Sequence, residues 1–139
     1  MSKTTLVRIV ANYGHQYLGL LNDSRTDDEQ PQWVQLVARG KKQGYAVGDV
    51  VQVTLTNTSS TPAQGAIEKV HERRNLFYRS EFNKQKNLAA NINQVAIICA
   101  TEPGFSEELL GRALICAHVA DIEALIVLNK VDVAELLPF

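Results

Sequence analysis

The feature that most constrains the fold is a pair of short apolar runs separated by a stretch of helical periodicity. Residues 94–100 (QVAIICA) form the first run, and residues 122–130 (IEALIVLNK) contain the second. Continuous apolar runs of this length are typical of strands covered on both faces, so both are predicted to be buried strands. Strand, helix and strand at these lengths predict a βαβ unit whose two strands are parallel and adjacent.

The intervening helix has a recognisable start. Ser106 is a suitable N-cap, and Glu107 and Glu108 follow in the first turn, where negative charge suits the helix dipole. Residues at i, i+3 and i+4 spacing form one apolar face, which comprises Leu109, Leu110, Ala113, Leu114 and Ala117.

The second run opens directly onto Asn129-Lys130-Val131-Asp132. Ligands of parallel sheets bind beyond the carboxyl ends of the strands, which is where this tetrapeptide is predicted to lie. Guanine presents two adjacent donors, N1–H and the N2 amino group, and the Asp132 carboxylate can accept both. Asn129 can serve the other edge of the base, and the aliphatic part of Lys130 can lie along its plane. The alternative is a polar turn without a ligand.

The first half of the chain has the pattern of short strands. Alternating segments within residues 4–70 are separated by turn signals such as Asn12-Tyr13-Gly14 and a polar loop containing Pro31. Five such strands without a helical stretch predict a small barrel, specifically an OB-like barrel of the kind that binds oligonucleotides. A purely structural appendage is the alternative.

Residues 71–93 are basic and rich in aromatic side chains. They carry five basic and two acidic residues, whereas residues 94–139 carry two and seven. Cations neutralise phosphates and aromatic rings stack on bases, so this segment indicates an RNA partner. A solvated linker is the alternative. Together with a barrel loop, the candidate nucleic-acid-binding residues are Arg39, Lys41, Lys42, Arg73, Arg74, Arg79, Lys84 and Lys86.

A phosphate-binding loop is missing upstream of the candidate guanine-reading loop. Such a loop requires G-x-x-x-x-G-K-[ST], but Gly40-Lys41 is followed by Lys42 and has no glycine five residues before it. Either the Asn-Lys-x-Asp sequence is accidental, or the order of a GTPase domain is circularly permuted.

The whole chain resembles the circularly permuted, ribosome small-subunit-dependent GTPases (GTPase A family). The pieces that carry the resemblance are ARGKK, VGDVV, ERRNLFYRS, KNLAANINQVAIICA, EPGFSEELLGRALICA and IVLNKVD. The resemblance implies β + α/β architecture: an N-terminal OB-like five-stranded barrel, then the first βαβ unit of a truncated, circularly permuted P-loop GTPase domain. The expected domains are residues 1–70 (OB), 71–93 (basic connector) and 94–139 (incomplete GTPase domain).

The resemblance also implies a function. Members hydrolyse GTP with Mg²⁺ in late maturation of the small (30S) ribosomal subunit, bind 16S rRNA, and carry one structural zinc in a C-terminal domain beyond the sequence given. In this chain only Asn129, Lys130 and Asp132 match the nucleotide motifs. We therefore expect an N-terminal fragment without GTPase activity, cytoplasmic and monomeric, with no DNA or membrane partner. A stand-alone OB-type RNA-binding module with a non-nucleotide α/β tail is the competing hypothesis.

Overall fold

The computed structural model describes residues 4–21, 30–40 and 44–133. The chain divides into two compact units, Met1–Asn91 and Ile92–Phe139. No helix within the described ranges has the length and apolar character needed to cross a membrane.

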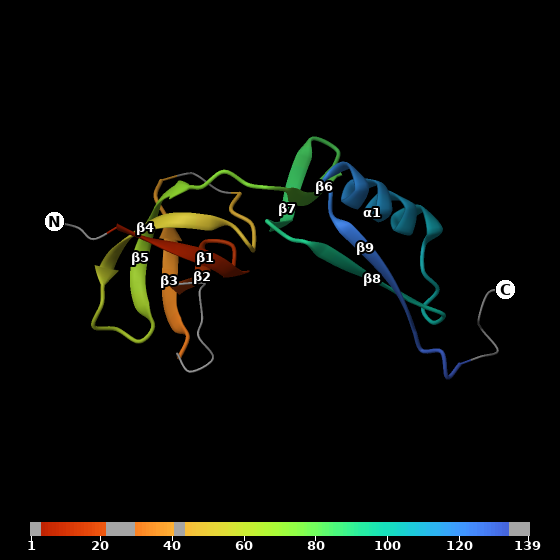
Figure 1. The fold of residues 1–139 in the computed structure, drawn as a ribbon, viewed down its shortest axis with the longest axis horizontal. Helices are drawn as coiled ribbons and strands as arrows, with labels where there is room; N and C mark the ends of the chain where they lie inside the picture. The colour runs from red at the N-terminus through yellow and green to blue at the C-terminus, as the bar shows by residue number, and fades with distance from the viewer. Residues whose placement is uncertain (1–3, 22–29, 41–43, 134–139) are drawn as a thin grey trace. The chain divides into compact units, whose positions relative to one another are not determined.

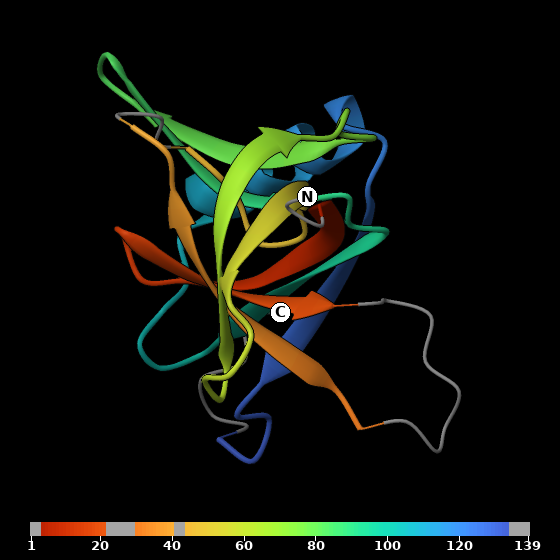
Figure 2. The same cartoon turned by 90° about the vertical axis from the view of Figure 1, so that its left-hand side faces the viewer.

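The first unit contains the predicted closed barrel of five strands. These are β1 (Thr4–Asn12), β2 (Gln16–Leu21), β3 (Gln32–Ala38), β4 (Val50–Asn57) and β5 (Ala63–Val70), in the order β1-β2-β3-β5-β4 (Figures 1 and 2). β1 pairs antiparallel with both β2 and β4, and β3 pairs parallel with β5. Period-two alternation places one apolar set inside, so Ile9, Leu36 and Ile67 are almost completely buried.

β5 begins earlier than its pattern predicts. The sequence predicts a turn up to Gly65 followed by a strand, whereas β5 already starts at Ala63. The parallel pairing with β3 explains the difference, because it starts at Val34 opposite Ala63. Tertiary pairing therefore extends the strand into a segment that reads locally as a turn.

The basic segment forms a β-hairpin that the sequence pattern did not predict. β6 (Leu76–Glu81) pairs antiparallel with β7 (Lys84–Ala90), and Phe82 lies at the turn with a φ of 52°. Phe82 is fully exposed. The hairpin belongs to the same compact unit as the barrel.

The second unit is the predicted βαβ unit. β8 (Gln94–Ala100) is followed by α1 (Glu107–Val119) and by β9 (Glu123–Asn129), which is parallel to β8 (Figure 1). The Ser106 N-cap is confirmed, because its hydroxyl accepts a hydrogen bond from the Leu109 N–H at 3.2 Å. β8 and β9 pair in register from Gln94–Glu123 to Ala100–Asn129, so both strands end at the same edge.

The prediction that both strands of this unit are buried is wrong for the described residues. All seven residues of β9 are exposed, and in β8 only Cys99 is buried. The helical face is also only partly covered, since Ala117 is buried but Leu109 is 68% exposed. Apolar composition predicted coverage on both faces, whereas two strands and one helix leave much of this surface open.

Candidate nucleotide-binding and nucleic-acid-binding sites

The Asn-Lys-x-Asp residues form a tight turn directly after β9. Asn129 is the last residue of the strand, and Lys130 adopts a left-handed backbone with a φ of 57°. The Lys130 N–H donates to Asn129 Oδ1 at 2.9 Å, and the Val133 N–H donates to the Lys130 carbonyl at 3.1 Å. These two bonds hold the backbone so that the side chain of Asp132 is exposed.

The side chain of Lys130 reaches the neighbouring strand's loop. Its ammonium donates to the carbonyl oxygen of Glu102 at 2.6 Å, two residues beyond the end of β8. The aliphatic part of Lys130 therefore spans the carboxyl edge of the parallel pair, where a ligand of such a sheet binds. Sequence reasoning did not find Glu102, because the bond uses a backbone carbonyl that any residue type supplies.

A buried hydroxyl lies at the same edge. Thr101 directly follows β8, and its Oγ1 is buried without a hydrogen-bond partner among the described residues. An orphaned polar atom of this kind is uncommon in folded proteins and calls for an explanation.

Arg73 is held by a partly buried ion pair within the first unit. Its Nε donates to Asp49 Oδ1 at 2.7 Å and its Nη2 to Asp49 Oδ2 at 2.8 Å, while Nη2 also donates to the Gly44 carbonyl at 3.1 Å. Asp49 is completely buried and also accepts the Ala46 N–H at 2.8 Å. The hydrogen bond to Asp49 raises the pKa of Arg73, so the guanidinium stays charged, and the Asp49 carboxylate compensates this charge locally.

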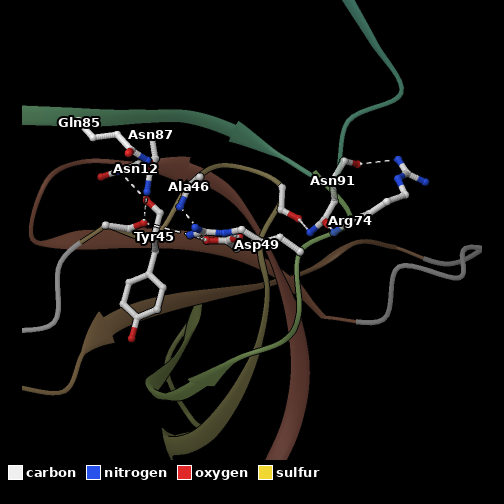
Figure 3. Close-up of polar contacts among 11 residues, drawn as sticks. Asn12, Tyr45, Ala46, Asp49, Arg74, Gln85, Asn87 and Asn91 are labelled. Atoms are coloured by element: carbon white, nitrogen blue, oxygen red, sulfur yellow. Dashed lines mark hydrogen bonds and ion pairs between the residues drawn. The ribbon is translucent and has the colours of Figure 1, made fainter. Parts of the chain in front are cut away.

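Residues 44–49 (the 44–49 loop) tie the hairpin to the barrel. Figure 3 shows the Asn87 amide directed at this loop, where it donates to the Gly44 carbonyl at 2.8 Å. The Asn91 amide donates to the Gly48 carbonyl at 3.0 Å, and the Ala90 N–H donates to the Val47 carbonyl at 2.8 Å. On the barrel side, the Gly48 N–H donates to the Ile9 carbonyl at 2.7 Å.

Two further predicted cations have partners within the first unit. The backbone N–H of Arg74 donates to Asn91 Oδ1 at 2.7 Å, and its guanidinium donates to the Asn91 carbonyl at 3.3 Å (Figure 3). Arg39 forms an ion pair with Glu68 at 2.9 Å, although 63% of its side chain is exposed. Arg39 and Arg74 are nevertheless both exposed residues. Lys41 and Lys42 lie outside the described residues.

The hairpin brings three predicted cations onto its exposed surface. Arg79, Lys84 and Lys86 are exposed, and Arg79 lies 3.8 Å from Glu81 in a loose surface ion pair. The register places Lys84 opposite Glu81 but places Lys86 opposite Arg79. Like charges directly opposite each other destabilise an antiparallel pair, so this arrangement is unfavourable without an anion.

The described residues do not provide a metal site. Across residues 4–21, 30–40 and 44–133, no three His, Cys, Asp or Glu side chains gather closely enough to hold an ion.

The sequence of this chain is similar to that of a known protein family. Residues 70–137 match the RsgA GTPase family. Small ribosomal subunit biogenesis GTPase RsgA of Burkholderia pseudomallei (strain K96243) is 44% identical over 131 residues, which cover 94% of this chain and 38% of that protein. The protein of the same name from Paraburkholderia phymatum is 45% identical over 130 residues, which cover 94% of this chain and 38% of that protein.

Solved structures share the fold. YjeQ from Thermotoga maritima superposes with a TM-score of 0.58 at 21% identity, over 94% of this chain and 42% of that chain. YloQ, described as a circularly permuted GTPase, gives 0.57 at 22% identity with the same coverage. The chain spans somewhat more than a third of the length of its curated relatives. The sequence matches to the family model and to these relatives show that the chain belongs to the RsgA GTPase family.

Proposed function

We propose that this chain supplies the guanine-reading loop and the rRNA-binding surface of a GTPase that acts in biogenesis of the small ribosomal subunit. One observation carries the nucleotide part of the proposal. The exposed Asp132 lies in a backbone-restrained turn at the carboxyl edge of two parallel strands, next to the Lys130 side chain that crosses this edge.

The chemistry of this loop fits guanine. The Asp132 carboxylate accepts from N1–H and from the N2 amino group of guanine, while the aliphatic part of Lys130 covers the base plane. Adenine would place its own acceptor, N1, against the carboxylate, and an unsatisfied pair of acceptors costs about 1–3 kcal/mol. Asn129 holds the turn through its Oδ1, which leaves its amide N–H groups for the other edge of the base. Hydrolysis of GTP by the whole protein, with Mg²⁺, is part of the same proposal.

The nucleotide proposal is tested by amide shifts in this chain. Guanosine monophosphate at millimolar concentration should shift the amide resonances of residues 129–133, and adenosine monophosphate should not. Asp132→Asn exchanges an acceptor for a donor, so the variant should lose the response to guanine and gain one to xanthosine monophosphate. Glu123→Gln, an exposed carboxylate at the start of β9, is the control and should respond like the parent protein. Equal shifts with both purines would refute base reading by Asp132.

The RNA part of the proposal rests on the exposed cations. The hairpin carries Arg79, Lys84 and Lys86, and the barrel carries Arg39 at the end of β3. Arg74 contributes its exposed guanidinium, and Lys41 and Lys42 belong to the same proposed surface by sequence. Arg73 is assigned here to structural support, because Asp49 already neutralises it.

Salt dependence tests this surface. Each phosphate contact steepens the fall of log K with log salt by about 0.7 for a single strand, so the loss of a contact makes the slope shallower. The triple change Arg79→Ala, Lys84→Ala and Lys86→Ala should therefore reduce the slope for 16S-type RNA by about 2. Lys69→Ala on β5 removes an exposed cation outside the hairpin and should leave the hairpin's contribution intact. A slope that the triple change does not alter would show that the hairpin does not contact phosphates.

A further inference from the structure

The outer surface of β2 and β3 carries a groove that the cations above do not explain. A hollow of about 550 Å³ adjoins a second one of about 250 Å³, and the two share Leu18 and Pro62. Trp33 lines the larger hollow and Tyr13 the smaller one, so an aromatic ring lies in each part. The other lining residues that matter below are Gln16 and Gln35.

The residues that line this groove are unusual for the outside of a barrel. Period-two alternation turns Val34 and Leu36 into the core and leaves Trp33, Gln35 and Val37 on the outer face. Trp33 is 40% exposed and Tyr13 is 71% exposed. Neighbouring exposed apolar groups around a hollow are typical of a binding surface, whereas isolated ones are not.

Amide groups lie in the groove beside the rings. Gln35 Nε2 donates to Gln16 Oε1 at 3.0 Å, which holds the two side chains together across β2 and β3. This bond uses one acceptor and one donor, so the Gln16 amino group and the Gln35 carbonyl can still offer one donor and one acceptor to a ligand. Such a pair can bind the polar edge of a base.

An uncharged groove within a basic unit favours a nucleic acid strand over a peptide as its ligand. None of the described residues that line the two hollows is charged, so the groove fits the uncharged faces of bases and not their phosphates. β3 leads directly into Arg39, whose side chain is 63% exposed. Residues 1–91 carry twelve basic and eight acidic side chains, which complements a polyanion.

We propose that this groove binds unpaired bases of a single RNA strand, with Trp33 as the stacking platform and Tyr13 as a second ring, while the phosphates face Arg39. The proposal rests on the RNA-binding function proposed above and assigns it a class of substrate, single-stranded RNA. Aromatic stacking of this kind tolerates any base, and the glutamine amides add a modest preference.

The sequence offers a specific reporter, because Trp33 is the single tryptophan of the 139 residues. A fluorescein-labelled uridine dodecamer measures binding by anisotropy, and an unlabelled dodecamer measures contact with the groove through Trp33 emission. The single strand should quench the emission with the same midpoint as the anisotropy change. A perfect RNA duplex of the same length should not quench it, because its bases are already stacked.

Substitutions separate stacking from charge. Trp33→Ala should weaken binding of the dodecamer about tenfold, and Trp33→Phe, which keeps a ring, should restore most of the affinity. Because stacking releases no counterions, Trp33→Ala should leave the salt slope unchanged, in contrast to the hairpin variants. Phe105→Ala, another exposed aromatic residue in the second unit, is the matched control and should bind normally. Thermal melts show whether each variant is folded.

Each outcome decides between the two proposals. Binding of RNA without quenching, together with normal affinity of Trp33→Ala, would overturn the groove and leave the RNA-binding function intact. Absence of RNA binding at any salt concentration would overturn both. Quenching by an uncharged proline-rich peptide and not by RNA would assign the groove to a protein partner and also overturn the proposal.

Discussion

Arg73 donates two hydrogen bonds to the carboxylate of Asp49, from Nε to Oδ1 at 2.7 Å and from Nη2 to Oδ2 at 2.8 Å, although the two residues are 24 positions apart. The carboxylate is completely buried, whereas 27% of the Arg73 side chain is exposed. The pair holds the 44–49 loop in place, and this loop hydrogen-bonds to both the hairpin and the barrel. The pair therefore supports the contact between these two parts of the first unit.

The first prediction concerns this pair. Arg73→Ala leaves the buried carboxylate without its countercharge and should lower the free energy of unfolding by about 3 kcal/mol. Arg39→Ala removes an exposed ion pair with Glu68 of similar length, 2.9 Å, and should cost at most about 1 kcal/mol. Urea denaturation of both variants measures the difference. Equal losses would mean that burial does not set the strength of the Asp49–Arg73 pair.

The second prediction concerns Gly48. Its φ is 93°, and a Cβ atom there would lie 1.9 Å from the carbonyl oxygen of Ala90. Gly48→Ala should therefore destabilise the first unit by more than about 4 kcal/mol, an exceptional value for one methyl group. Gly14 has a similar φ of 90° but no atom within 4 Å of such a Cβ. Gly14→Ala should cost only the roughly 1–2 kcal/mol of a left-handed backbone, and thermal melts of the two variants would reveal the contrast.

The third prediction concerns stability at alkaline pH. Burial, and then the neighbouring Tyr45, raise the pKa of Tyr17 above 10.0, while burial and then the charge of Asp49 raise the pKa of Tyr45. The unfolded chain therefore releases these protons at lower pH than the folded protein. This contribution to stability is complete below about pH 10 and is lost as the pH rises toward the folded pKa values.

Denaturation at several pH values checks this effect. The free energy of unfolding should fall as the pH rises above about 10, and that of the double variant Tyr17→Phe, Tyr45→Phe should fall less steeply. An unchanged slope in the double variant would assign the alkaline loss to other groups.

The fourth prediction concerns the like charges of the hairpin. Lys86→Glu places a carboxylate opposite Arg79 and should stabilise the hairpin by up to about 1 kcal/mol at low salt, while it weakens RNA binding. Lys84→Glu makes the same change in charge but places two carboxylates opposite each other, since Lys84 pairs with Glu81. It should destabilise the hairpin and also weaken RNA binding.

Amide hydrogen exchange in residues 76–90 measures the local stability. Faster exchange in Lys86→Glu than in the parent protein would show that the Arg79–Lys86 arrangement costs nothing. If Lys86→Glu stabilises the hairpin and Lys84→Glu destabilises it, while both bind RNA more weakly, the effect of these lysines on folding is separate from their effect on RNA binding.

The elements predicted from sequence are those with a clear period. The alternation in β4 and the N-cap Ser106 of α1 are local signals, and the structure confirms them. The parallel pairing of β8 and β9 also follows from sequence, because a strand–helix–strand of this length has few other solutions.

The features that sequence reasoning missed depend on distant partners. β6 and β7 are mostly polar and their turn at Phe82 lacks a glycine, so neither the strands nor the turn gives a local signal. The structural role of Arg73 depends on Asp49, and a basic residue in a basic segment reads as an RNA contact. The exposure of β9 does not follow from its apolar composition, which indicates a covered strand, but it does follow from the element count, because two strands and one helix leave one face of a sheet uncovered.

The bonds of the 44–49 loop hold the hairpin against the barrel within the first unit. The groove beside Trp33 and the cations of β7 therefore belong to one folded unit. An RNA that contacts both has to match the spacing that this unit gives them. A flexible RNA strand would lose much conformational entropy on contacting both sites, whereas an RNA already folded to that spacing would lose less. Under the proposed RNA binding, the first unit would therefore select an RNA by its shape as well as by its charge.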